Sequence, residues 1–174
     1  MTVTKVRKDH GAMTLAITAE FKADPERAWS LWSDPRQLER WWGPPGYPAT
    51  VVDHDFVPGG YVRYYMSGPD HQPHGWWRFL AIDAPRSLEF ENGLADEHGE
   101  PDPGMPVMVV RASLTGLAGG GTRMTVEATF PDADAMAQFL EMGMEEGMAA
   151  AVGQIDGILD AGVHSGGVDR RETV

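Results

Sequence analysis

The chain of 174 residues contains no cysteine, which excludes disulfide bonds, thiolate zinc sites and a cysteine nucleophile. No apolar run approaches the ~20 residues that span a bilayer, and residues 1–11 lack the apolar core of a secretory signal. With 42% hydrophobic residues, the chain is long enough to bury one core of ordinary size. These features predict a single cytoplasmic domain.

Familiar catalytic motifs are missing as well, since the sequence has no Gly-x-Ser-x-Gly, phosphate loop or dinucleotide fingerprint. His71 and His74 lie in a predicted turn, and two nitrogens alone do not make a zinc site. Asp53 and Asp55 alternate with His54 on a predicted strand, so the carboxylates and the imidazole lie on opposite faces of the sheet. We therefore expect no metal, no cofactor and no catalytic set.

Positive charge is scarce, and the net charge of −12 is unevenly placed. Residues 132–161 hold seven acidic residues and no Lys or Arg, and residues 93–106 hold four acidic residues. Such a surface repels phosphate backbones and anionic lipids, so we expect neither nucleic-acid nor membrane partners. The acidic stretch is either a solvated helix face or a docking face for a basic partner. The partner is either another protein or, in a homodimer, a second copy of this chain.

Turn and capping residues divide the chain into strands and short helices. Alternation predicts a strand at residues 13–22. Asp24-Pro25 and Asp34-Pro35 then begin two short helices, because Asp is a good N-cap and Pro fits the first helical position. Further strands are predicted at residues 50–56, 61–67, 76–82, 87–91, 107–114 and 123–130. The sequence therefore predicts seven antiparallel strands, with two helices inserted after the first.

A single long helix is predicted from Asp132, as N-cap, to Gly162, a favoured residue just past a helix end. At 100° per residue one face carries Met136, Leu140, Gly143, Met144, Gly147, Ala151, Gln154, Ile155 and Ile158, which predicts that this face lies on the sheet. Glu145 lies on the opposite, solvent-facing side. Residues 162–174 form a polar tail to which we assign no role.

Three residues on this helical face, Gly143, Gly147 and Gln154, are unusual for the buried side of a helix. Gly143 and Gly147 each cost roughly 1 kcal/mol relative to alanine in a helix, so either a strand packs closely against them or they leave space for a ligand. The side chain of Gln154 needs polar partners, which are either backbone carbonyls or a polar part of a cavity.

Four segments together carry a family resemblance: Trp41-Trp42-Gly43-Pro44, His74-Gly75-Trp76-Trp77-Arg78-Phe79, Gly121-Thr122-Arg123-Met124 and Met142-Gly143-Met144-Glu145-Glu146-Gly147-Met148. They resemble the START-like superfamily (the SRPBCC, or helix-grip, domains). The branch is the one related to the C-terminal domain of the activator of the heat-shock-protein ATPase. The resemblance covers residues 12–161 and leaves residues 1–11 as an N-terminal arm. It implies an α+β helix-grip fold, in which a curved seven-stranded antiparallel sheet wraps the long helix around an apolar cavity.

The resemblance implies that a small apolar molecule binds in this cavity, which we expect to measure a few hundred Å³. The predicted binding residues are Trp42, His54, Tyr64, Trp77, Phe79, Gly143, Met144, Gly147 and Gln154. His54 belongs to this set if Val52 and Phe56 face inward with it. Residues 93–106 are predicted to form a mobile flap at the cavity entrance.

Two other functions fit the resemblance. The first is a cyclase or lyase, as found elsewhere in the superfamily, with His54, Tyr64 or Glu146 transferring protons. The second is a co-chaperone-like interaction module that uses the acidic helix face.

Overall fold

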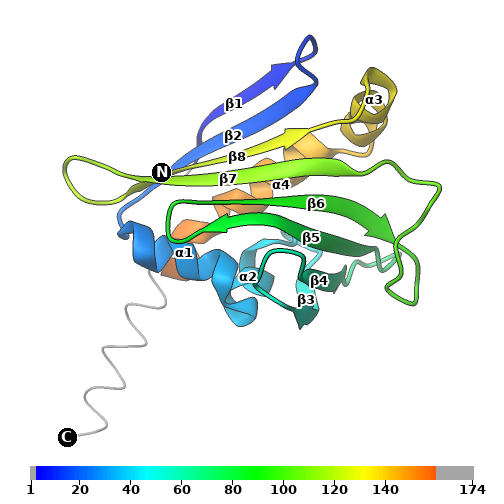
Figure 1. The fold of residues 1–174 in the computed structure, drawn as a ribbon, viewed down its shortest axis with the longest axis horizontal. Helices are drawn as coiled ribbons and strands as arrows, with labels where there is room; N and C mark the ends of the chain where they lie inside the picture. The colour runs from blue at the N-terminus through cyan, green and yellow to red at the C-terminus, as the bar shows by residue number, and fades with distance from the viewer. Residues whose placement is uncertain (1–2, 160–174) are drawn as a thin grey trace, which may run out of the picture.

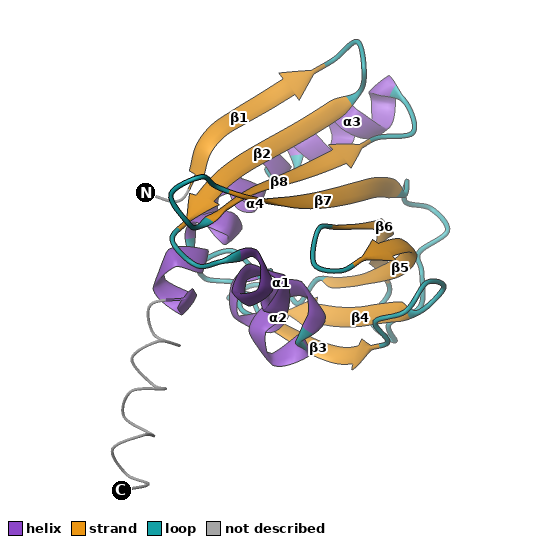
Figure 2. Ribbon diagram, turned by 60° about the vertical axis from the view of Figure 1, so that its left-hand side comes forward, coloured by secondary structure: helices purple, strands orange, loops and turns teal. Residues whose placement is uncertain are grey.

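The computed structural model describes residues 3–159, which form one curved antiparallel sheet with four helices (Figures 1 and 2). The strands are β1 (Val3–Asp9), β2 (Thr14–Phe21), β3 (Ala49–His54), β4 (Tyr61–Met66), β5 (His74–Asp83), β6 (Ser87–Ala95), β7 (Met108–Gly116) and β8 (Thr122–Thr129). The helices are α1 (Pro25–Ser33), α2 (Pro35–Trp41), α3 (Ala133–Glu141) and α4 (Met144–Gly153). This is the α+β helix-grip architecture that the sequence predicts.

The strand order is β1-β2-β8-β7-β6-β5-β4-β3. The chain leaves β2 through α1 and α2, re-enters the sheet at its far edge as β3, and returns strand by strand until β8 pairs with β2. The helices α3 and α4 follow β8 and lie across the inner side of the sheet (Figure 2). Among the described residues, no helix combines the length and the hydropathy needed to cross a membrane.

The sheet has one strand more than predicted. The additional strand is β1, which is built from residues of the predicted N-terminal arm and pairs with β2 from Val3 to Asp9. Most of its side chains are exposed, so β1 has none of the alternation between buried and exposed residues by which a strand is recognised in a sequence.

The two short helices begin as predicted. The carboxylate of Asp24 accepts a hydrogen bond from the Arg27 amide at 2.8 Å, and that of Asp34 accepts one from the Arg36 amide at 2.9 Å. A proline occupies the first turn of each helix. These local signals fix where α1 and α2 start, because they satisfy amide groups that have no partner within the helix.

The predicted long C-terminal helix is wrong, because the structure has two helices there. Asp132 does cap α3, accepting a hydrogen bond from the Ala135 amide at 2.7 Å. However, α3 ends at Glu141, and Gly143 adopts φ 86°, a left-handed conformation that glycine tolerates best. The apolar periodicity continues through this break, so a helical wheel does not detect it. Gly162, the predicted end, lies outside the described residues.

The predicted orientation of the 50–56 strand is half wrong. Val51 is buried and Val52 is 62% exposed, which is the reverse of the expectation. An irregularity in the pairing with β4 between Val51 and Asp53 then inserts one residue and turns His54 back to the inner face, opposite buried Val62. Because a bulge shifts the alternation by one, His54 faces inward while Val52 does not.

The predicted flap of residues 93–106 is partly strand, since β6 continues to Ala95. Beyond it, the carboxylate of Asp96 accepts hydrogen bonds from the amides of His98 at 2.9 Å and Glu100 at 3.0 Å. Ala95 and Pro101 form an isolated β-bridge. The segment thus contains a tight turn organised by Asp96, and its mobility stays a prediction that amide hydrogen exchange tests.

Candidate functional site

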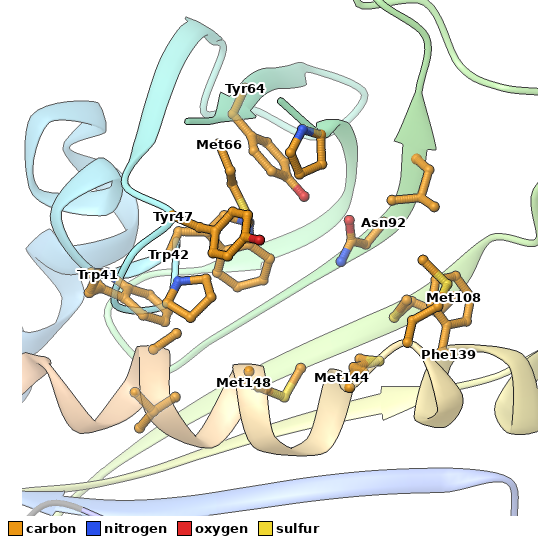
Figure 3. Close-up of a pocket in the computed structure, with 18 of the residues that line it drawn as sticks. Trp41, Trp42, Tyr47, Tyr64, Met66, Asn92, Met108, Phe139, Met144 and Met148 are labelled. Carbon is orange, nitrogen blue, oxygen red and sulfur yellow. The ribbon is translucent and has the colours of Figure 1, made fainter. Parts of the chain in front are cut away.

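A pocket of about 420 Å³ lies between the inner face of the sheet and the helices α3 and α4 (Figure 3). The α2 end and the following loop supply Trp41, Trp42, Pro44 and Tyr47; the strands and the loop after β4 supply Tyr64, Met66, His71, Pro73, Asn92, Leu94, Met108 and Val126; the helices and their junction supply Phe139, Met142, Gly143, Met144, Gly147, Met148, Ala151 and Val152. This volume falls within the usual range for small-molecule sites.

Methionine side chains form much of the wall. Five of the ten methionines in the chain line the pocket, from β4, β7 and the α3–α4 region: Met66, Met108, Met142, Met144 and Met148. The Met142 side chain is 58% exposed, which places it where the pocket opens to solvent. Because methionine is unbranched and polarizable, such a wall adapts to ligands of different shape.

Gly143 and Gly147 occupy positions that favour glycine for different structural reasons. At Gly143 the backbone has φ 86°, which side chains disfavour. At Gly147 the backbone is helical, and a Cβ atom placed there would meet no atom within 4 Å. No strand packs against Gly147, so this glycine leaves open space at the pocket wall.

Tyr64 and Asn92 are the most buried polar side chains of the pocket, and each is 8% exposed. The Tyr64 ring crosses the sheet directly over Gly75, where any Cβ atom would collide with the ring. Burial raises the pKa of the Tyr64 hydroxyl above its ordinary value of 10.0, and the indole N–H groups of Trp42 and Trp77 partly offset this rise. Neither indole N–H completes a hydrogen bond of regular geometry.

Of the predicted binding residues, Trp42, Tyr64, Gly143, Met144 and Gly147 line the pocket. Trp77 and Phe79 do not, because they are fully buried beneath it in an aromatic cluster. Trp77 stacks on Phe90 with ring centroids 4.0 Å apart and meets Trp42 edge-on at 4.7 Å. Trp77 therefore packs against Trp42, which lines the pocket, from the side away from the pocket.

His54 also lies outside the pocket lining. Its Nε2 is 3.0 Å from the carbonyl oxygen of Trp32 in the last turn of α1, and its ring stacks on Phe56 with centroids 5.6 Å apart. Since a carbonyl oxygen only accepts, Nε2 carries the proton and donates it to a carbonyl that has no partner within the helix. His54 thus caps α1.

Gln154 is the fourth predicted residue outside the lining. Its Nε2 donates to the carbonyl oxygens of Gly43 at 2.8 Å and Trp41 at 3.2 Å. Of the two alternatives left open by the sequence, the structure shows carbonyl capping. The contact joins the segment that follows α4 to the end of α2.

Asn92 is a buried polar wall residue that the sequence analysis missed. The predicted strand ended at residue 91, whereas β6 continues to Ala95. Extending the alternation of buried Leu88 and Phe90 by two residues places Asn92 on the same inner face. That signal would have identified it.

The charged residues of α4 lie away from the pocket. Glu145, predicted to face solvent, forms an ion pair with Lys8 of β1 at 2.8 Å, and this contact raises the pKa of Lys8. Glu146 is exposed and does not line the pocket. Within residues 3–159, no three His, Asp or Glu side chains are grouped as a metal site requires.

Comparisons with known proteins agree with this architecture. A protein from Arthrobacter aurescens, solved by NMR, is 50% identical, with 92% of this chain and 93% of that chain covered and a TM-score of 0.88. A crystal structure from Mycobacterium smegmatis is 47% identical, with 90% and 96% covered and a TM-score of 0.84. A Silicibacter pomeroyi AHSA1 protein, at 20% identity and a TM-score of 0.67 over 85% of this chain and 98% of that one, shares the fold.

No functionally curated protein matches the chain. Residues 22–160 match the family described as activator of Hsp90 ATPase homolog 1-like protein. This match covers all four helices and every strand from β3 to β8. The chain therefore belongs to the activator of Hsp90 ATPase homolog 1-like family.

Proposed function

We propose that this protein binds a small, largely apolar molecule in the pocket between the sheet and α3–α4. The observation that carries the proposal is the character of the wall: among the described residues that line the pocket there is no Asp, Glu, Lys or Arg. A space of about 420 Å³ is also large enough to hold a small molecule.

The presence of glycine at position 147 indicates that the space beside it is kept for a ligand and is not merely imperfect packing. Alanine at this position would meet no neighbouring atom within 4 Å and would favour the helix by roughly 1 kcal/mol. The glycine therefore lowers helix stability while it keeps the pocket wider. An apolar ligand that fills this space recovers contacts that the empty wall lacks.

The pocket offers less to the enzyme hypothesis. Two of its three proton-transfer candidates lie elsewhere: His54 is hydrogen-bonded to the Trp32 carbonyl, and Glu146 is exposed. Tyr64 does line the pocket, but its raised pKa makes it a poor base at neutral pH. The residues that line the pocket therefore support ligand binding better than they support proton transfer.

The test is binding of Nile red, an uncharged hydrophobic dye, measured by fluorescence. We expect Gly147→Leu to weaken binding at least tenfold, because the new side chain enters the pocket. Gly153→Leu is the matched control: Gly153 is also in α4 with no atom within 4 Å of its Cβ position, but it does not line the pocket. Equal binding by the parent and both variants would contradict the proposal.

A further inference from the structure

We infer that the ligand carries an uncharged carbonyl group, whose oxygen is held by the Tyr64 hydroxyl and the Asn92 carboxamide. This inference rests on the proposed function and adds the chemical class of the molecule bound. Both side chains line the pocket, each is more than nine-tenths buried, and they point toward the same region of it (Figure 3).

Neither group has a protein acceptor for its protons. Among residues 3–159, no hydrogen bond is donated by the Tyr64 hydroxyl or by the Asn92 side-chain amide. Neither polar end is among the fully buried side-chain atoms that lack a partner, so both are accessible to water in the pocket, and a ligand that displaces this water must replace its hydrogen bonds. A ligand atom that accepts hydrogen bonds would satisfy both side chains at once.

The surroundings of Tyr64 determine that the ligand accepts. The indole N–H groups of Trp42 and Trp77 are donors only, and both act on the Tyr64 oxygen. Neither indole completes a regular hydrogen bond to that oxygen, but both are donors, so they offer no acceptor for the Tyr64 proton, which is left to be donated into the pocket. The hydroxyl is protonated at neutral pH, since its ordinary pKa is 10.0 and burial raises the pKa further.

The accepting group is uncharged. No Lys or Arg lines the pocket in the described part of the chain, and the lining histidine His71 is exposed, so a carboxylate or phosphate deep in the pocket would be buried without a counter-ion. A ketone or ester oxygen accepts two hydrogen bonds without charge and fits these conditions.

The test compares benzophenone with diphenylmethane, which differ only in a carbonyl in place of a methylene group. Displacement of Nile red gives both affinities in the same protein. Diphenylmethane is the more apolar compound and leaves water more readily, so a preference for benzophenone requires hydrogen bonds. We expect benzophenone to bind roughly fivefold to tenfold more tightly.

Two variants locate the hydrogen bonds. Tyr64→Phe and Asn92→Leu are each expected to weaken benzophenone binding by roughly fivefold, and to leave diphenylmethane within about twofold. The infrared carbonyl stretch of carbon-13-labelled benzophenone should fall on binding to the parent and return toward its free value in each variant. If Tyr64→Phe does not fold, Asn92→Leu and the infrared shift in the parent still decide the question.

The possible outcomes distinguish failure of the carbonyl assignment from failure of the proposed ligand binding. Equal affinity of the two compounds, unchanged in both variants, would overturn the carbonyl assignment and leave apolar binding intact. Nile red binding that survives Gly147→Leu would instead overturn the proposed function. A preference for benzophenone that disappears in Asn92→Leu supports both.

Discussion

One sheet covers two interiors that differ in how they are filled. Beside α1 and α2 the space holds large rings in contact: Trp32 meets Trp41 at 4.8 Å, and Trp77 stacks on Phe90 at 4.0 Å. Beside α4 the corresponding space is the pocket, where the helix presents Gly147 and adaptable methionines. The difference teaches that the helices decide which part of this fold is core and which part is site.

Trp42 stands on the border between the two. It meets Trp77 of the filled side edge-on at 4.7 Å and Tyr64 of the pocket at 6.2 Å. The aromatic cluster therefore acts as a rigid back wall, and the methionine and glycine side acts as the adaptable front wall. The predictions below test this division, from the largest expected effect to the smallest.

The largest effect is expected from removing a ring of the filled side. Trp77→Ala should lower the free energy of unfolding by about 3–5 kcal/mol, because it leaves a cavity in a packed core. Met148→Ala should cost only about 1 kcal/mol, since this side chain already borders open space. Urea denaturation measures both, and similar losses for the two variants would remove the distinction between the walls.

A smaller loss is expected where the two halves are joined. Gln154→Leu leaves the carbonyls of Trp41 and Gly43 without their side-chain donor, and should cost about 1–3 kcal/mol. Gln138→Leu is the control, because that exposed side chain on α3 donates a long hydrogen bond of 3.7 Å to the Met105 sulfur and none to a backbone carbonyl of the described residues. If both variants unfold at the same urea concentration, Gln154 does not hold the segments together.

The two glycines should respond with opposite signs to the same substitution. Gly143→Ala should destabilise the protein by about 1–2 kcal/mol, because an alanine resists a left-handed conformation. Gly147→Ala should stabilise it by up to about 1 kcal/mol, because its position is helical and open. Thermal unfolding of the two variants side by side gives the comparison. A loss at Gly147 would mean that space there is not free.

The last effect appears only at alkaline pH. Burial raises the pKa of Tyr64 in the folded protein above 10.0, so the unfolded chain releases this proton first. The stability that depends on Tyr64 is thus complete below pH 10 and is lost as the pH rises beyond it. Absorbance titration should show one of the four tyrosines ionising late, and Tyr64→Phe should remove that step. Four tyrosines titrating together would contradict the burial of Tyr64.

What the sequence predicts well is local. The caps of α1 and α2 depend on Asp24 and Asp34, whose side chains bond amides two or three residues away. The strands with clear alternation, such as β8, follow from a period of two. Both signals depend on neighbours in the chain, which the sequence displays directly.

What the sequence misses depends on partners far away in the chain. The strand β1 is held by pairing with β2 rather than by its own burial pattern. His54 faces inward because of an irregularity against β4, and Gln154 is occupied by carbonyls more than a hundred positions earlier. The position of Gly143 in a left-handed turn is invisible to an apolar period that runs through it. Site residues were therefore harder to predict than the fold.

The pairing of β2 with β8 has a consequence for how the chain is made. Thr18 and Thr125 lie 107 positions apart, and their side-chain oxygens are 3.3 Å apart in the finished sheet. During synthesis on the ribosome, β2 therefore cannot pair with β8 until most of the chain has been made. Contacts of such long range slow folding, and any nascent chain that stops short of β8 exposes the unpaired edge of β2 to other chains.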